Sequence, residues 1–373
     1  MSRHFFVIGC GQFGAALATR LLGRGYGVTV LDDGFGADRQ TPWGWFRRAT
    51  LQPRSRQPGL IEPMCLPFTR KGPMIISSSR DASRRLWQQW LDGWRGNTDA
   101  RLLTRQERDE FAIRDRHAIL CDSRDFLLDF SSYHAHLMER IHDDRRAVVI
   151  PSRMRSFGHR DRTVTRLVTE TGNGLRVDDR DTVVFALGNQ TTRFFSYPIL
   201  RIRLPFMDVA PAAGMPSSGV LAWWNETASI QHHEGFTRIG CGLQGRVDAL
   251  PELRYWHRYM SFLGKTRYAH SGPDVPARLL RAAFTRLGLP PGLWRDDAIR
   301  SCVVDATPAF RPIVDFWGRN ALVVHGFSGS GFTAHEDWFL RDILDSLENH
   351  HRPVPRLRAL APLFSRDDRS FLY

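Results

Sequence analysis

The stretch GCGQFG places three glycines, Gly9, Gly11 and Gly14, in the spacing G-x-G-x-x-G. In this spacing the first glycine permits a tight turn, the second lets the backbone approach a pyrophosphate, and the third lets a helix pack closely on a strand. Asp32 follows about twenty residues later, at the distance from which a carboxylate binds ribose hydroxyl groups. The spacing therefore predicts a dinucleotide-binding site, and Asp33 is the alternative acid.

The segments around this motif have the patterns of a β-α-β unit. Residues 4–9 (HFFVIG) predict a short buried strand, residues 15–27 have the apolar spacing of a helix that ends in glycines, and residues 28–32 (VTVLD) predict a second strand. The N-terminus of the helix then faces the pyrophosphate with its positive dipole end. The alternative is a glycine-rich turn that only packs a helix on a sheet, and the motif alone does not separate NAD from FAD.

Two further motifs lie near the end of the chain. Cys302 belongs to a predicted strand within IRSCVVDATPAFRPIVD, and residues 326–332 (GFSGSGF) precede a helix expected from near Thr333. Glycines at this turn let the backbone approach a planar ring, and a helix N-terminus there stabilises negative charge on the ring. The alternatives are a helix-capping turn and, for the cysteine, a small apolar residue of the core.

Composition excludes several classes of protein. The chain has 373 residues, of which 42% are hydrophobic, and this predicts two domains or one large α/β domain. It has neither a run of 18 apolar residues nor a charged-then-apolar leader, so we expect a cytoplasmic protein with no membrane partner. The five cysteines are odd in number and form no C-x-x-C pair, which predicts reduced thiols and no metal site.

The positive charge of the chain is carried almost entirely by arginine. The net charge is +13, but Lys71 and Lys265 are the only lysines, and the arginines are spread along the chain among acids. No helix-turn-helix, RNP or zinc-finger pattern accompanies this charge, so we expect no nucleic-acid partner.

Taken together, four segments resemble the D-amino-acid oxidase superfamily of FAD enzymes, in the branch of monomeric sarcosine oxidase and pipecolate oxidase. They are GCGQFG with Asp32, DTVVFALG, SCVVDATPAFRPIVD and ALVVHGFSGSGF. In that branch a cysteine at the position of Cys302 carries the flavin through its 8α-methyl group, although Val304 stands here where the family usually has tyrosine. The resemblance implies FAD, covalent through Cys302, bound by Gly9, Gly11, Gly14, Asp32, Arg47, Gly188, Cys302, Gly329, Ser330, Gly331, Phe332 and Thr333.

The substrate site departs from that branch. Thr50 and Thr333 stand where the resemblance implies an arginine and a lysine that clamp a substrate carboxylate, and Arg48 is the residue that could replace them. Trp224 stands at the position of a pocket methionine, and Trp43 belongs with it to an unusually aromatic set. We therefore expect a bulky or aromatic substrate rather than a small N-methyl amino acid.

The expected catalytic residues depart as well. Gln244 stands in place of a lysine that helps to activate dioxygen, Asp248 in place of an active-site histidine, and His232 and His233 in place of tyrosines. Together with Arg47 beside the flavin, these residues form the expected catalytic set.

The resemblance also implies a fold. We expect an α/β protein with a discontinuous, Rossmann-like FAD-binding domain (1–50, 145–205 and 300–373) and a substrate domain with a mixed or antiparallel sheet (51–144 and 206–299). Helices are predicted at 79–96, 128–144 and 276–287, and strands at 147–151, 163–171 and 181–188.

The expected function is oxidation of a C–N bond in a small amine or amino-acid-derived substrate, of the kind found in specialised metabolism. Hydride transfer to flavin N5 gives an imine, and the electrons pass to dioxygen or another acceptor. The alternatives are an NAD-dependent dehydrogenase and a flavin-binding protein without amine oxidase activity.

Overall fold

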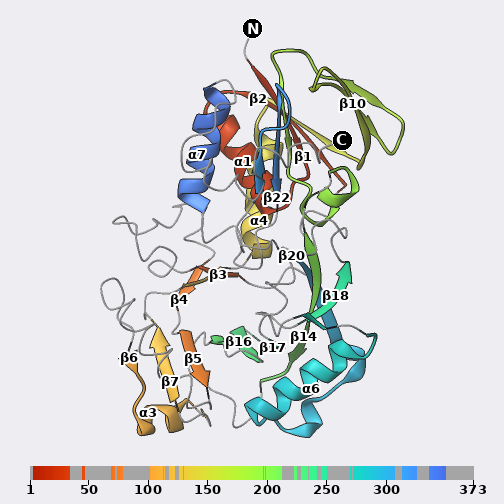
Figure 1. The fold of residues 1–373 in the computed structure, drawn as a ribbon. Coiled ribbons are helices and arrows are strands. Elements are labelled where there is room, and N and C mark those ends of the chain that lie inside the picture. Colours follow the sequence, from red (N-terminus) through yellow and green to blue (C-terminus); the bar gives the residue numbers. More distant parts are fainter. Residues whose placement is uncertain are drawn as a thin grey trace, which may run out of the picture.

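A computed structural model gives the fold (Figure 1). It describes residues 3–33, 44–46, 69–71, 74–78, 101–111, 113, 117–121, 126–128, 130–195, 197, 199–211, 222–224, 228–233, 235–241, 245–249, 269–270, 272–306, 313–325 and 336–349. The expected helix at 79–96 lies outside these residues.

The first sheet has six strands and contains the predicted β-α-β unit. Its order is β21 (Ile313–Asp315), β22 (Ala321–His325), β13 (Thr182–Phe185), β1 (His4–Ile8), β2 (Gly27–Asp32) and β9 (Ala147–Pro151). All neighbouring pairs are parallel except β21 with β22. Helix α1 (Gln12–Gly23) connects β1 to β2, so the two strands and the helix predicted around the glycine motif are confirmed.

Both faces of this sheet are buried, which explains the continuous apolar run of β1. Phe5 and Val7 pack with α1, α4 (Phe130–Asp143) and α7 (Glu336–Glu348) on one face. Figure 1 shows α1 and α7 side by side against the strands. Phe6 and Ile8 face the other side, where the small sheet of β10 (Met154–Arg160), β11 (Thr163–Thr169) and β12 (Gly174–Arg176) covers them.

The second sheet has ten strands and is mixed, as predicted. Its order is β19 (Ala269–His270), β18 (Gly245–Ala249), β14 (Leu200–Val209), β17 (Phe236–Gly240), β16 (Ser229–His233), β15 (Ala222–Trp224), β5 (Met74–Ser78), β7 (His117–Cys121) and β6 (Arg101–Leu102), and β20 (Ile299–Ala306) pairs with β14. Its pairs are antiparallel except β15 with β5 and β18 with β19. Helix α6 (Val275–Leu287) packs on β14 and β17.

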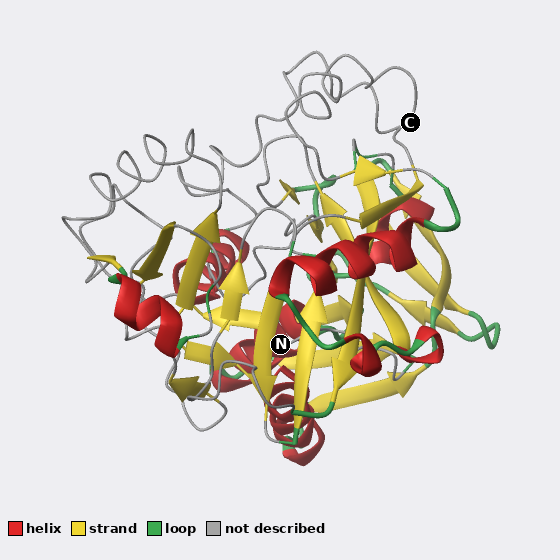
Figure 2. Ribbon diagram, turned by 90° about the horizontal axis from the view of Figure 1, so that it is seen from below, coloured by secondary structure: helices red, strands yellow, loops and turns green. Residues whose placement is uncertain are grey.

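The strand that carries Cys302 belongs to this second sheet, whereas β21 and β22, which follow it in the chain, belong to the first. The chain therefore passes from one sheet to the other between residues 306 and 313. A fourth sheet, of three short strands, β3 (Gly44–Phe46), β8 (Phe126–Leu128) and β4 (Thr69–Lys71), completes the described strands. In the view from below, the described helices lie against the strands (Figure 2).

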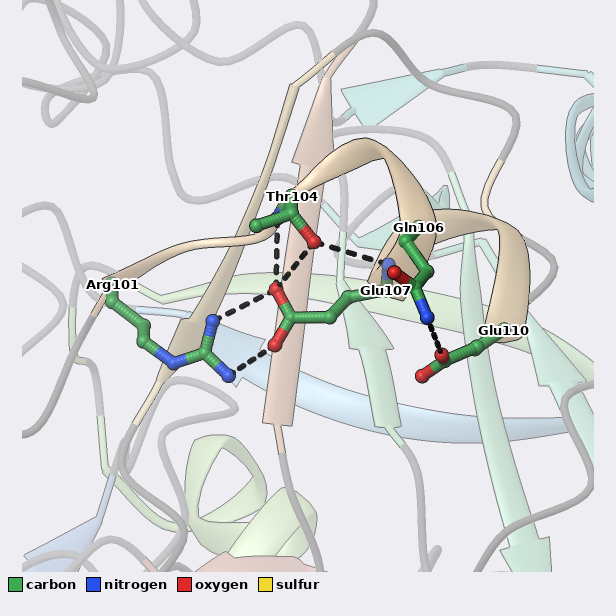
Figure 3. A network of polar contacts seen from close by, with 5 residues as sticks. All are labelled: Arg101, Thr104, Gln106, Glu107 and Glu110. Atoms are coloured by element: carbon green, nitrogen blue, oxygen red, sulfur yellow. Dashed lines mark hydrogen bonds and ion pairs between the residues drawn. The ribbon is translucent and has the colours of Figure 1, made fainter.

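The short helix α3 (Arg105–Glu110) is held by polar side chains rather than by burial (Figure 3). Thr104 and Glu107 form a capping box, and Arg101 binds the Glu107 carboxylate with both terminal nitrogens. The hydrogen bonds from Arg101 lower the pKa of Glu107 to about 2. Across the described part of the chain, no helix has the length and apolar character needed to cross a membrane.

Candidate functional site

The turn after β1 holds two glycines tightly against other backbone atoms. Gly9 has φ +89°, and a Cβ added there would lie 2.5 Å from the carbonyl oxygen of Ala186. A Cβ on Gly14 would lie 2.0 Å from the carbonyl oxygen of Gly9. Neither position accepts a side chain, so the start of α1 packs directly on the ends of β1 and β13.

The start of α1 is suited to an anion. Gly11 is its N-cap, no side chain caps the helix, and no acidic residue lies in its first turn. The amide N–H groups of that turn and the positive end of the helix dipole are therefore offered to a ligand.

The two acids at the end of β2 have different partners. Asp32 Oδ2 accepts a hydrogen bond from the backbone N–H of Cys10, which places its carboxylate beside the glycine turn. The Asp33 carboxylate instead forms an ion pair with Arg153. A ring nitrogen of His134, on α4, lies 2.6 Å from the Cys10 carbonyl oxygen and fixes the turn from the other side. The acid beside the turn is thus Asp32.

Three strand ends meet at the carboxyl edge of the first sheet. Ile8 on β1 is in register with Phe185 on β13, and Phe185 is in register with Val323 on β22. The chain leaves β1 toward β2 on one side, while β13 lies on the other side. This reversal creates the crevice in which open α/β sheets bind ligands.

Gly188 follows β13 at this edge and begins the 3-10 helix η2 (Gly188–Arg193). Its φ is +52°, and a Cβ added there would meet no atom of the described residues within 4 Å. The described residues therefore leave the backbone open at this position.

A group of charged and polar side chains also lies at this edge, and we call it the Arg201–Asp305–His325 cluster; Asp305 and His325 are buried, and Arg201 is partly exposed. Arg201 Nε donates to Asp305 Oδ1 at 3.2 Å, and Arg201 Nη2 donates to Thr192 Oγ1 at 3.1 Å. His325, the last residue of β22, is 2% exposed, and its Nε2 lies 3.5 Å from Asp305 Oδ2. The cluster connects the first sheet with β14 and β20 of the second.

The protonation of the cluster follows from its burial. Burial lowers the pKa of His325 to about 3, with the charge of Arg201 acting in the same direction and the Gly188 backbone against both. Burial raises the pKa of Asp305, although Arg201 opposes this. At neutral pH the imidazole is therefore uncharged.

Cys302 lies in the middle of β20 and is 7% exposed. Cys302 pairs with Leu204 of β14, and Phe206 lies two residues further along that strand. Phe206 pairs with Gly240 of β17, and Gly240 pairs with Ser229 of β16. Paired residues share a face of a sheet and neighbours in a strand alternate, so Cys302, Phe206 and Ser229 lie on one face.

His232 lies on the opposite face of this sheet. It is three residues from Ser229 and pairs with Thr237, whose Oγ1 lies 3.0 Å from His232 Nδ1. Ile230 and Ile239 share its face, and Ile239 packs against α6. Burial lowers the pKa of His232. The structure therefore does not bring His232 and Cys302 together.

For three other expected residues the structure gives the strand but not the side chain. His233 pairs with Phe236 in β16, Trp224 pairs with Ser229 in β15, and Asp248 lies in β18 where the pairing with β14 shifts register. The remaining expected residues lie outside the described part of the chain: Trp43, Arg47, Arg48, Thr50, Gln244, Gly329, Ser330, Gly331, Phe332 and Thr333.

Comparison with known protein families identifies the family of this chain. The family model described as FAD dependent oxidoreductase (DAO) matches residues 4–335. The chain belongs to this family. No curated protein sequence matches it significantly.

Solved structures show that the family fold extends over the chain. L-amino acid deaminase from Proteus vulgaris is 14% identical, with a TM-score of 0.73, over 98% of this chain and 97% of that one. L-proline dehydrogenase from P. horikoshii is 16% identical, with a TM-score of 0.72, over 100% and 99%. Glycine oxidase from Geobacillus kaustophilus is 16% identical, with a TM-score of 0.70, over 98% and 99%. At these identities the likeness shows the fold.

The described residues of this FAD-dependent oxidoreductase fit the cofactor of the family. The glycine turn, the uncapped start of α1 and the Asp32 carboxylate offer the groups that a pyrophosphate and a ribose require. The ring nitrogens of His325 and the hydroxyl of Thr191 are buried polar groups without a hydrogen-bond partner in the described part of the chain. The sequence analysis did not select Arg201, Asp305 or His325, and the only local signal was the position of His325 directly before the GFSGSGF turn.

Proposed function

We propose that this protein oxidises a C–N bond of an amine or amino-acid-derived substrate and releases an imine. The observation that carries the proposal is the meeting of the two sheets: β20, with Cys302 at its centre, reaches the carboxyl edge of the cofactor sheet through Asp305 and His325. The names of the structural relatives, a deaminase, a proline dehydrogenase and a glycine oxidase, support substrates with a C–N bond.

When bound, FAD supplies a two-electron acceptor for the hydride that leaves the carbon next to the amine nitrogen. The chain's own part is to hold this cofactor: the first turn of α1 would bind the pyrophosphate, and Asp32 would bind ribose hydroxyl groups. Cys302 would hold the flavin through a thioether to its 8α-carbon. This bond would replace the thiol S–H and one 8α C–H bond, and the two electrons released would reduce the flavin and then pass to dioxygen or another acceptor. The buried position of Cys302 in a paired strand supports a fixed attachment point.

The remaining side chains act on the substrate. An amine must be unprotonated to release a hydride, so a base near its nitrogen is required. We propose His233 or Asp248 for this role, because Cys302 and His232 lie on opposite faces of the sheet.

The substrate pocket has its own residues. Trp43 and Trp224 contribute a flat apolar wall, and Arg48 replaces the carboxylate clamp that is absent at Thr50 and Thr333. The resemblance implies that Arg47 would lie beside the flavin and that Gln244 would take the place of a lysine that helps to activate dioxygen.

The test is anaerobic bleaching of the flavin absorbance against a panel of amines. We expect bulky or aromatic amines to bleach the holoprotein and sarcosine to bleach it slowly or not at all. Efficient bleaching by sarcosine would contradict the bulky substrate class, and a flavin that no amine bleaches would favour a flavin-binding protein without amine oxidase activity. A colourless protein that binds NAD would favour the NAD-dependent dehydrogenase.

A further inference from the structure

His325 is buried, and the described residues around it do not supply the hydrogen bonds of good geometry that a buried imidazole normally makes. Its side chain is 1% exposed, and neither ring nitrogen has a hydrogen-bond partner in the described part of the chain. Most buried polar atoms in folded proteins do have one, because losing water without replacing its hydrogen bonds costs free energy. Packing alone therefore does not account for a histidine at this position, where an apolar residue would be more stable.

Two polar neighbours face the His325 ring without completing a hydrogen bond of good geometry in the described residues, and one of them is the Gly188 backbone, which raises the pKa of the imidazole. Asp305 Oδ2 faces Nε2 at 3.5 Å, and the Asp305 carboxylate is held on its other side by Arg201. Because Arg201 neutralises this carboxylate, the cluster has no net charge while the imidazole is neutral. Asp305, Arg201 and the Gly188 backbone thus orient the ring, and within the described residues they do not complete its hydrogen bonds.

The position of the ring indicates what that partner is. His325 ends β22, two residues beyond the pairing of Val323 with Phe185, and is therefore level with the turn after β13. Helix η2 begins at that turn, is in contact with β22, and contains Thr191, whose hydroxyl is likewise buried without a partner in the described residues. Two unsatisfied polar groups thus lie at the carboxyl edge where this fold binds its cofactor.

We propose that His325 is a cofactor-positioning residue: Asp305, held by Arg201, orients its imidazole, and the second ring nitrogen forms a hydrogen bond to bound FAD. A neutral imidazole suits this role because it brings no charge to the site and can donate at one nitrogen while it accepts at the other. The proposal rests on the cofactor of the family and does not depend on the amine substrate.

The experiment measures FAD affinity and the stability of the cofactor-free protein separately. All variants are made in the full-length chain with Cys302→Ser, so that FAD exchange is reversible whether or not Cys302 normally carries the flavin. Quenching of FAD fluorescence gives the dissociation constant, and urea unfolding gives the stability of the apoprotein.

His325→Leu should lower FAD affinity without lowering the stability of the apoprotein. We expect FAD affinity to fall about tenfold, which corresponds to one lost hydrogen bond. Apoprotein stability should stay constant or rise, because the substitution removes unsatisfied polar atoms from the interior. His325→Asn should keep FAD affinity within about threefold, since an amide still offers a hydrogen-bonding group. If the leucine variant does not accumulate, His325→Ala, which cannot overpack the site, replaces it: we expect the same loss of FAD affinity relative to His325→Asn, together with a loss of apoprotein stability from the cavity that alanine leaves.

His4 supplies a matched control in the same sheet. It lies at the amino end of β1, away from the crevice, and its Nε2 lies 2.8 Å from Thr29 Oγ1. His4→Leu should therefore destabilise the apoprotein and leave FAD affinity unchanged.

Three results would overturn the proposal. They are an unchanged FAD affinity in His325→Leu, a loss of affinity matched by a loss of apoprotein stability in that variant, and equal weakening by asparagine and leucine. Because no amine enters the assay, a failure here is distinct from a failure of the proposed C–N oxidation.

Discussion

Cys302 and His232 lie on opposite faces of the second sheet. The strand pairing through β14 and β17 places Cys302 on the same face as Ser229, and His232, three residues after Ser229 in β16, points to the other face. A flavin attached at Cys302 then contacts the face that His232 does not share. We expect His232→Gln to leave the pH profile of amine-dependent flavin bleaching unchanged and to lower stability by about 1 kcal/mol, the value of one hydrogen bond. Thr237→Val removes the other partner of that bond and should cost about as much. A shifted pH profile in His232→Gln would place this imidazole at the reacting amine.

The covalent attachment is tested with Cys302→Ser. Wild-type protein should keep its flavin after acid precipitation, and its intact mass should exceed that of the apoprotein by one FAD less two hydrogens, while Cys302→Ser should release FAD. Cys241→Ser is the control, because this second buried thiol packs in the core beneath α6. Free FAD in the acid supernatant of mature wild-type protein would show that Cys302 is an ordinary core residue.

The two neighbouring acids of β2 should have separate effects. Asp32→Ala should weaken FAD binding tenfold or more, on the order of one charge-assisted hydrogen bond to a ribose hydroxyl. Asp33→Ala breaks the partly exposed ion pair with Arg153 and should cost at most about 1 kcal/mol of stability without loss of cofactor. Fluorescence titration with FAD, in chains that also carry Cys302→Ser, and urea unfolding measure the two effects. Equal loss of FAD affinity in both variants would contradict the assignment of Asp32.

Glycine-to-alanine substitutions before α1 and at its end should change the free energy of unfolding in opposite directions. Gly9→Ala places a Cβ 2.5 Å from the Ala186 carbonyl oxygen at a φ of +89°, and we expect a loss of roughly 1–3 kcal/mol in apoprotein stability. Gly23→Ala, at the exposed end of α1, meets no atom within 4 Å and should stabilise by up to about 0.5–1 kcal/mol. Urea unfolding of both variants provides the comparison, and a neutral Gly9→Ala would show that the turn relaxes.

The buried imidazole of His325 should make the apoprotein sensitive to acid. Its pKa is lowered by burial to about 3, whereas a histidine in an unfolded chain titrates near pH 6.5. Between these values the unfolded chain binds a proton that the folded protein does not, so the unfolding free energy falls as the pH falls. From pH 7 to pH 5 this component amounts to about 2 kcal/mol. Urea unfolding at both pH values should show a smaller loss for His325→Leu, and parallel losses would contradict the burial of a neutral ring.

Local patterns in the amino-acid sequence were enough to predict the parts of this protein that depend on neighbouring residues. The glycine spacing, the apolar strands on either side and the helix between them are local patterns, because turn geometry and side-chain alternation act over a few residues. The same holds for α4, α6 and the strand of Cys302, all of which the structure confirms. The ordered motifs also identified the family.

Which distant residues come into contact depends on the assembled fold. Arg201 and Asp305 are 104 residues apart. No spacing in the sequence distinguishes Arg201 from the many other arginines of the chain, and none links Arg201 or Asp305 to His325. Strand alternation shows that His232 and His233 belong to opposite faces, but the choice of face depends on the register with β17, which pairing across the sheet sets. Long-range pairing and the burial it produces are properties of the assembled sheets, so a reading of local patterns does not contain them.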